Sequence, residues 1–352
     1  MYRDASCYLA RVQRYDVAIV GGGPVGLVAA IEARLAGMSV ALIEQRAGVI
    51  DKACGEGLMP GAVTILERLG VDPEGMPIAG ITYAQGAKSI THRFTGSAGR
   101  GVRRTELHGA LTRRATALGV ARTEAKVDHL EQSQDGVALA GIEAEYVLAC
   151  DGLHSGIARM LGLALPAPRR RRRYGLRRHY AMEPWTDTVE IHYGRHAEVY
   201  ITPIARNEIG VAVLGPQHTD FDAAIADIPS LAAGLDGAVA TSGLRGAGPF
   251  RQRTRARTSG RVLLVGDASG YVDAITGEGL RVGFAQAAAA VGCIGRGSVG
   301  DYEAEWDAAT RDFRVTTAAL VGFATSPLRR GIVPLSRALP GRFGAIVDAL
   351  SR

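Results

Sequence analysis

Three glycines near the start of the chain constrain its fold more than any other feature of the sequence. Gly21, Gly23 and Gly26 have the spacing GxGxxG, between an apolar, strand-like run at residues 15–20 and a helical pattern at 27–36. This order predicts the first strand and helix of a βαβ unit. In such a unit the first glycine permits a sharp turn, the second lets the backbone approach a pyrophosphate, and the third lets helix and strand pack closely.

The residues that follow the glycines extend this prediction to a dinucleotide site. The N-terminus of a helix points free N–H groups and a partial positive charge at phosphates. A second apolar strand at residues 39–43 leads to Glu44, where a carboxylate can bind the ribose hydroxyls. Gln45 and Arg46 come next and are assigned to the same site.

The size and composition of the chain indicate a globular protein with two closely joined domains. It has 352 residues, of which 47% are hydrophobic and 22% charged. No apolar run reaches the roughly 18 to 20 residues of a membrane-spanning helix, and the first 14 residues do not resemble a secretory signal. We therefore expect a cytoplasmic protein.

Charge and cysteine content narrow the classes of partner. The formal charge of +6 suits anionic partners such as the phosphates of a dinucleotide. An arginine run at residues 169–173, followed by Arg177 and Arg178, suggests nucleic acid as a rival partner, but a solvated linker or strand start explains these arginines better. The four cysteines form no CxxC pair, so neither a disulfide framework nor a zinc site is expected, and we predict no metal.

The rest of the chain alternates between the patterns of the two sheets. Helices are predicted at 61–69 and 105–118, a hairpin at 78–83 and 89–94, and a buried strand at 261–265. Successive strands between residues 174 and 214 predict an antiparallel sheet. The chain after residue 301 is predicted to be helical, with breaks at Pro327, Pro334 and Pro340.

Two further motifs turn the dinucleotide prediction into a resemblance to a known family. The pattern DGxxSxxxR contains Asp151, Gly152, Ser155 and Arg159, and the segment VLLVGDASGYVDAITGEGL begins at residue 262. With GxGxxG, these motifs resemble the flavoprotein monooxygenase superfamily over roughly residues 15–291. That group includes the single-component aromatic hydroxylases, the flavin-dependent halogenases and the geranylgeranyl reductases.

The resemblance implies FAD as the cofactor and NADPH or NADH as a transient reductant. It implies that Asp267, after Gly266, holds the ribityl chain, and that Asp151 and Gly152 lie near the FAD. It also implies that an arginine at the start of a helix, here Arg104 in RTELHGAL, reaches the flavin side. Gly277 and Gly279, in the segment ITGEGL, are assigned to the cofactor site as well.

The motifs do not select one branch of the superfamily. Aromatic hydroxylases continue their GD motif with a histidine and two prolines, where this chain has Gly270, Asp273 and Ala274. The segment CGEGL at residues 54–58 is instead similar to a loop of the reductases. That similarity implies an active-site role for Cys54 and a proton-donor role for Glu56.

Other features bear on the remaining branches. Tyr200, on a predicted strand of the antiparallel sheet, is a further candidate to face the substrate. The paired tryptophans and catalytic lysine of halogenases are missing. No carboxylate spacing marks a histidine as a base, and structural roles are expected for His154, His179, His192 and His196.

The expected fold is α/β, with a Rossmann-like three-layer FAD-binding domain, an interleaved antiparallel β-sheet substrate domain and a helical C-terminal tail. The expected boundaries are 15–74, 100–165 and 255–320 for the FAD-binding domain, 75–99 and 166–254 for the substrate-binding sheet domain, 321–352 for the tail, and 1–14 for an extension.

The leading functional hypothesis is an NAD(P)H-dependent monooxygenase that hydroxylates an aromatic or polyketide-like small molecule in secondary metabolism. A reductase or dehydrogenase of an isoprenoid or other unsaturated chain is the alternative. A halogenase and a non-catalytic lipid or prenyl carrier are less favoured. The tail mixes apolar residues with arginines, so it could rest on a membrane surface, although a helical lid packed on the domain is the preferred interpretation.

Overall fold

The first half of the molecule is built around one central parallel strand. The computed structural model describes residues 13–166 and 172–351. In it, β1 (Gln13–Val20) pairs in parallel with β2 (Val40–Glu44) and with β11 (Ile142–Ala149). The sheet order is β20-β21-β11-β1-β2-β8. The remaining strands are β8 (Ala121–Glu124), β20 (Thr258–Ser259), β21 (Val262–Leu264) and a hairpin of β9 (Leu130–Gln132) and β10 (Val137–Leu139) that extends β11.

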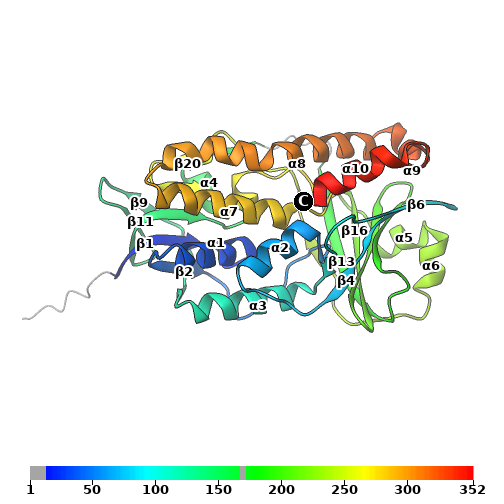
Figure 1. Ribbon diagram of the computed structural model, residues 1–352, viewed down its shortest axis with the longest axis horizontal. Coiled ribbons are helices and arrows are strands. Elements are labelled where there is room, and N and C mark those ends of the chain that lie inside the picture. The colour runs from blue at the N-terminus through cyan, green and yellow to red at the C-terminus, as the bar shows by residue number, and fades with distance from the viewer. Residues whose placement is uncertain (1–12, 167–171, 352) are drawn as a thin grey trace, which may run out of the picture.

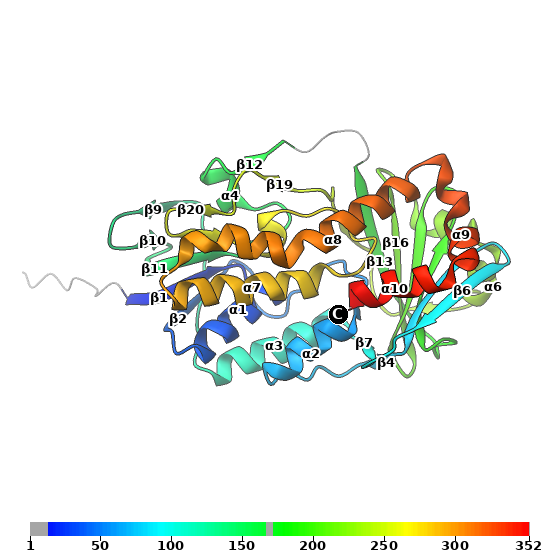
Figure 2. The ribbon, with the colours of Figure 1, turned by 45° about the horizontal axis from the view of Figure 1, so that its top comes forward.

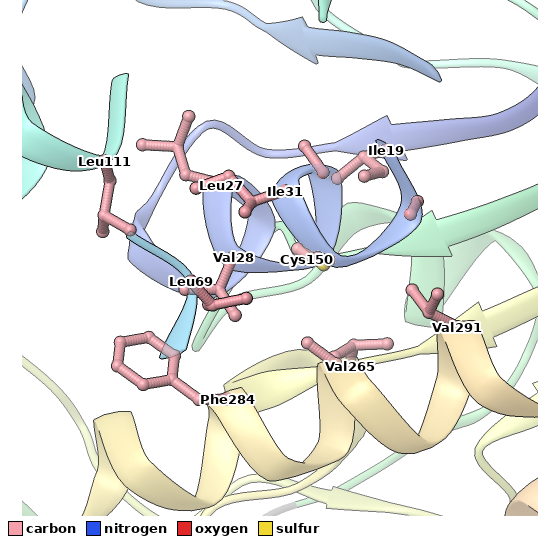
Figure 3. Close-up of a cluster of buried hydrophobic side chains, with 14 of the residues drawn as sticks. Ile19, Leu27, Val28, Ile31, Leu69, Leu111, Cys150, Val265, Phe284 and Val291 are labelled. Carbon is pink, nitrogen blue, oxygen red and sulfur yellow. The ribbon is translucent and has the colours of Figure 1, made fainter. Parts of the chain in front are cut away.

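Helices cover one face of this sheet and complete a layered arrangement (Figure 1). They are α1 (Pro24–Leu35), α2 (Pro60–Arg68), α3 (Arg104–Ala117) and α7 (Gly279–Gly295). Figure 3 shows Phe284 of α7, Leu111 of α3 and Val28 of α1 converging on one apolar core. A second core on the opposite face includes Ile157 of α4 (Gly156–Met160). Both faces are covered, as a parallel sheet requires.

The second half is an antiparallel sheet with one parallel pair. Its order is β17-β13-β16-β15-β14-β5-β6, with β18 paired to β13, and only β14 and β5 run parallel. Its strands are β5 (Gly80–Gln85), β6 (Lys88–Arg93), β13 (Arg173–Ala181), β14 (Thr188–Tyr193), β15 (Glu198–Ala205), β16 (Glu208–Pro216), β17 (Val239–Ala240) and β18 (Arg245–Ala247). Two short helices, α5 (Phe221–Ala226) and α6 (Pro229–Gly234), cover its outer face.

A small three-stranded sheet joins the two halves. It consists of β3 (Gly57–Leu58), β7 (Gly99–Gly101) and β4 (Met76–Ile78). At its junction with the second sheet, a Cβ on Gly101 would lie 1.7 Å from the carbonyl oxygen of Pro203 in β15. Any side chain there would push the two sheets apart, so Gly101 fixes their close contact.

The C-terminal helices return from the first half to cover the second. α8 (Tyr302–Ala324) packs on α7, and α9 (Ile332–Ala338) and α10 (Pro340–Ser351) lie against β6 (Figure 2). A short 3-10 helix, η3 (Pro327–Gly331), connects α8 to α9. Pro334 was predicted to break the helix, and this is wrong, because it lies in the first turn of α9, where its missing N–H needs no partner.

The predicted fold class is confirmed by this architecture and by the placement of the helical tail. β1 begins at Gln13, two residues earlier than predicted, and residues 1–12 of the expected extension lie outside the described residues. α8 runs through the expected boundary at residue 320, and the division into domains stays a prediction. In the part of the chain described, no helix has the length and apolar content needed to cross a bilayer.

Candidate functional site

One large cavity lies where the carboxyl ends of the parallel strands meet the inner face of the second sheet. Ligands of open α/β sheets bind at this edge. The empty space inside it, including its mouth, is about 1700 Å³. The predicted site residues that line it are Gly21, Gly23, Glu44, Arg46, Cys54, Glu56, Arg104, Asp151, Gly152, Tyr200, Gly266, Asp267, Gly277 and Gly279. Gln45 is exposed and does not line it.

The three glycines of the first loop occupy distinct environments. Gly21 has a φ of +108°, and a Cβ there would lie 2.4 Å from the carbonyl oxygen of Cys150. A Cβ on Gly26, at the contact between helix and strand, would lie 1.9 Å from the oxygen of Gly21. A Cβ on Gly23 would meet no atom within 4 Å. Gly21 and Gly26 therefore shape the loop, whereas Gly23 leaves space for a ligand to approach the backbone.

The first turn of α1 faces this space without a competing side chain. Gly23 is the N-cap residue and Pro24 follows it, with no side-chain cap and no acidic residue in the first turn. Uncapped N–H groups at a helix N-terminus attract phosphate oxygens.

Glu44 closes the loop from the end of β2. Its carboxylate accepts hydrogen bonds from the backbone N–H of Gly22 at 2.7 Å and from the N–H and side chain of Arg46 at 3.0 Å. Burial alone would raise the pKa of Glu44, but the hydrogen bonds from Arg46 and Gly22 outweigh it and lower the pKa. Glu44 is therefore held as a carboxylate at the ribose end of the predicted cofactor site.

Asp151 and Asp267 bring two further carboxylates to the cavity. Oδ2 of Asp151 accepts the backbone N–H of Ile157 at 3.1 Å, while its buried Oδ1 has no partner among the described residues. Burial raises the pKa of Asp267, against the opposing charges of Lys52 and Arg104. The unpartnered Oδ1 of Asp151 is suited to accept a hydrogen bond from a hydroxyl group of a ligand.

A buried polar network connects the second sheet to the loop before α2. Nε2 of His179 lies 2.6 Å from Oε2 of Glu56, and Oε1 of Glu56 accepts the backbone N–H of Arg104 at 2.8 Å. Nδ1 of His179 lies 3.1 Å from the guanidinium of Arg177, which in turn bonds to Asp51. Arginine can only donate, so Nδ1 is the acceptor and the proton of His179 sits on Nε2, pointing at Glu56.

Glu56 therefore holds its position through two donors, and it has a φ of +61°, which is rare outside glycine. This geometry suits a positioning role, and the proton-donor role of Glu56 stays a prediction. Cys54 is half-buried and lines the cavity, where its Sγ accepts the backbone N–H of Glu56 at 3.4 Å. Tyr200 lines the cavity as well, but its hydroxyl donates to the carbonyl of Ile275 at 3.0 Å.

The far part of the cavity is apolar. It lies under the second sheet and beside the loop before α7. Its aliphatic and aromatic lining consists of Met59, Ile81, Leu153, Val189, Ile191, Ala212, Leu214, Ala247, Phe250 and Ala274. Phe250 and Tyr271 form an edge-to-face pair at this wall, with ring centroids 5.9 Å apart. A hydrophobic or aromatic molecule would bury its surface here.

Glu278 places a buried carboxyl group directly before α7. Its side chain is fully buried, Oε2 bonds to Arg281, and Oε1 has no partner in the described part of the chain. Burial raises the pKa of Glu278 to about 7, although Arg281 opposes this shift.

Several polar residues of the cavity were missed from the sequence. Lys52, one of three lysines in the chain, lines it close to Gly152, and burial lowers the pKa of Lys52. Arg177 also lines the cavity, although the sequence favours a solvated linker or strand start for the arginines around it. Residues 169–171 of that run lie outside the described part. Arg173 is the first residue of β13, as the strand-start alternative predicts. Because Arg173 and Arg177 are buried, the solvated-linker alternative is wrong for both. Alternation along β13 could have placed Arg173, Arg177 and His179 on one face.

The other three histidines considered from the sequence do not line the cavity. His192 bonds to Glu190 at 2.8 Å, His154 lies 3.1 Å from the carbonyl of Gly248, and His196 is exposed. Within residues 13–166 and 172–351, no three His, Cys, Asp or Glu side chains group in a way that could hold a metal ion.

The comparisons with known proteins agree with the chemistry of this cavity. Residues 14–294 match the family described as the FAD binding domain. The chain belongs to this family. The flavoprotein is an FAD-dependent oxidoreductase, as predicted, and its place in the flavoprotein monooxygenase superfamily is confirmed.

The relatives of the flavoprotein carry out different reactions. It is 29% identical to menaquinone reductase of Mycolicibacterium smegmatis, over 83% of its own length and 79% of the relative. It is 28% identical to a 12-dehydrotetracycline 5-monooxygenase/anhydrotetracycline 6-monooxygenase of Streptomyces rimosus, over 78% of its own length, but spans only 61% of that relative. Its fold is similar to a flavoprotein/dehydrogenase from Cytophaga hutchinsonii, with a TM-score of 0.83, 17% identity, and coverage of 96% and 92%.

The residues present fit FAD. The open space at Gly23 and the uncapped α1 suit the pyrophosphate, and Glu44 suits a ribose. The unpartnered Oδ1 of Asp151 and the carboxyl of Asp267 suit hydroxyl groups further along the cofactor. The individual contacts of these residues with FAD stay predictions.

Proposed function

We propose that this flavoprotein is an NAD(P)H-dependent reductase that saturates a carbon–carbon double bond in a hydrophobic, isoprenoid-like substrate. The observation that carries the proposal is the chemistry of the far part of the cavity. Its wall is aliphatic and aromatic, and three of its polar side chains, those of Glu56, Tyr200 and Thr202, are already bonded to protein groups. A phenolic substrate would find no free carboxylate or imidazole base at this wall among the described residues.

The lengths of the relatives support the same choice. The chain spans 79% of the menaquinone reductase but 61% of the tetracycline monooxygenase. This favours the reductase over the monooxygenase, which was the leading hypothesis from the sequence.

Different residues of the cavity have different roles in the proposed reaction. When bound, FAD supplies the hydride for one carbon of the double bond, and NADPH or NADH replenishes it. The other carbon needs a proton, and we assign this to the thiol of Cys54. The N–H of Glu56, which points at Sγ, stabilises the thiolate left behind, and solvent returns the proton. The apolar wall orients the substrate and excludes water.

Product analysis without oxygen tests the proposal. The flavoprotein is incubated under nitrogen with NADPH or NADH and with geranylgeraniol or a short-chain polyprenyl quinone. We expect a product heavier by two hydrogens, and in D2O one deuterium bound to carbon. Cys54→Ser should lower the rate at least about 100-fold at unchanged FAD content, as loss of a general acid does. Cys293→Ala, at a buried cysteine of α7 outside the cavity, is the matched control and should retain the rate. Absence of a saturated product from fully reduced flavoprotein would contradict the proposal.

A monooxygenase acting on an aromatic molecule is the second candidate. It is favoured by Arg177, whose buried Nε has no partner among the described residues and could bind a phenolate, and by the ring pair of Phe250 and Tyr271. In this case NADPH consumption would require oxygen and rise at least tenfold with a phenolic substrate, and one oxygen atom from O2 would enter the product.

A further inference from the structure

The tail has an inner apolar face that fixes it to the protein. Ile332 and Val333 of α9 and Phe343 and Val347 of α10 are buried. The ring of Phe343 packs on Tyr83 of β5, with centroids 4.9 Å apart. These contacts bury one face of the two helices.

Other apolar residues of the tail are exposed beside this buried face. Leu335 and Leu339 are four residues apart on and just after α9, and their exposed fractions are 53% and 42%. Ile346 of α10 is 48% exposed, and it shares a helix face with Arg342, four residues before it. We define the tail surface by its exposed apolar residues, which are Phe323, Leu328, Leu335, Leu339 and Ile346. Five such residues between positions 323 and 346 point to an interaction surface on the tail.

The charge of the tail surface has a single sign. Residues 323–347 contain four arginines and neither aspartate nor glutamate. Arg329 pairs with Glu198 of β15 at 2.7 Å. Arg330, Arg337 and Arg342 are exposed, and none of them forms an ion pair with another residue of the described part. These three guanidinium groups are therefore available to an anionic partner.

The tail surface lies over the apolar wall of the cavity. One continuous apolar cluster joins Val333 and Phe343 of the tail to Ile81 and Ile191, which line the cavity. A hydrophobic molecule that approaches through the tail would therefore meet apolar side chains along its route. This part of the argument rests on the proposed function, because it assumes a hydrophobic substrate.

We propose that the tail surface docks on a lipid bilayer that contains anionic headgroups. Exposed leucines interspersed with unpaired arginines, without carboxylates, match the interface of such a bilayer. The guanidinium groups lie at the level of the phosphates and the apolar side chains reach below them. The enzyme then draws a hydrophobic substrate from the membrane on which it rests.

Vesicle flotation of the complete FAD-loaded flavoprotein tests the proposal. The vesicles contain phosphatidylcholine alone or with about one third phosphatidylglycerol. We expect binding to the mixed vesicles only, and weaker binding at 0.5 M salt because exposed charges are screened. The variant Arg330→Glu/Arg337→Glu/Arg342→Glu should bind at least tenfold more weakly, since each basic residue near an anionic surface contributes about fivefold.

A second reversal variant controls for net charge. Arg113→Glu/Arg206→Glu/Arg255→Glu changes three exposed arginines outside the tail and should bind as the wild type does. FAD absorbance and thermal unfolding must match in all proteins.

A third variant, Leu335→Ser/Leu339→Ser, leaves the charge unchanged. It should also bind the mixed vesicles at least fivefold more weakly, because it removes apolar contacts with the bilayer. Equal binding by both reversal variants, or no binding by the wild type, would overturn the proposal. A dimer in solution that only the tail variants dissociate would also overturn it, in favour of a second copy of the chain as the partner. None of these readouts depends on turnover, so they stand apart from the test of the proposed reaction.

Discussion

Nε2 of His179 donates a hydrogen bond to Oε2 of Glu56 across 2.6 Å, and both side chains are only 1% exposed. The bond joins β13 of the second sheet to the loop that carries Cys54, although the two residues are 123 positions apart. Because Glu56 also accepts the N–H of Arg104, this pair determines where the loop lies relative to α3.

Removal of the Glu56 carboxylate should therefore affect both stability and cofactor binding. We expect Glu56→Ala to lower the free energy of unfolding by about 3 kcal/mol, because two buried donors lose their acceptor. A double-mutant cycle with His179→Ala should give a coupling energy of about 1 to 3 kcal/mol by denaturant unfolding. The pair His192–Glu190, at 2.8 Å, has more exposed side chains (11% and 16%), so it provides the control cycle and should couple more weakly. Equal coupling energies in the two cycles would contradict the role given to Glu56.

Gly23 and Gly26 should respond differently to alanine. A Cβ at Gly23 meets nothing, so Gly23→Ala should leave the thermal unfolding of the FAD-free protein within 2 °C and raise the Kd for FAD at least tenfold. Gly26→Ala forces a Cβ against the oxygen of Gly21 and should destabilise the FAD-free protein itself. Fluorescence titration with FAD and calorimetry separate the two effects. Loss of stability in Gly23→Ala would show that its open space is structural.

Glu278 should make stability fall as pH rises through neutrality. Its pKa is about 7 in the folded protein against 4.5 ordinarily, so the folded protein retains a proton that the unfolded chain has lost. This contribution is complete below about pH 4.5 and is lost as pH rises through 7. In Glu278→Gln, the decrease in unfolding free energy between pH 5 and pH 8 should be smaller by roughly 2 kcal/mol. Identical pH profiles in guanidinium unfolding with saturating FAD would refute this assignment.

Arg329 should anchor the tail. It pairs with Glu198, a buried carboxylate that also bonds to Arg173, and burial raises the pKa of Glu198 against the charges of both arginines. We expect Arg329→Met to lower the unfolding free energy by about 2 kcal/mol and to speed hydrogen exchange in residues 327–347. Arg330→Met, at an exposed neighbour, should change stability by less than about 0.5 kcal/mol. Unchanged exchange in the Arg329 variant would mean that the apolar contacts of the tail suffice.

Much of the cofactor half could be predicted because its determinants are local. Gly21, Gly23 and Gly26 lie in one turn, and Glu44 ends the next strand, so spacing alone brings them together. Asp151 and Asp267 follow buried strands, and parallel strands all end at the same edge of the sheet. Local spacing and the shared edge of the sheet therefore suffice to predict that these residues lie close together.

The substrate half could not be predicted in the same way, because its residues meet through long-range pairing. The contact of Glu56 with His179 depends on the register of β13, which no local pattern fixes. Nothing in the sequence distinguishes Arg177 from the surface arginines, but in the folded protein it is buried and bonds to Asp51. The roles of Cys54 and Tyr200 depend on a substrate that no motif specifies.

The order in which the chain visits its two sheets has a consequence for biosynthesis. The parallel sheet begins with β1, but its neighbour β21 comes only at Val262–Leu264, and α7, which covers it, ends at Gly295. The entire second sheet is synthesised between these parts. More than four fifths of the chain must therefore leave the ribosome before the FAD cavity can close. FAD is then bound late in synthesis or after it.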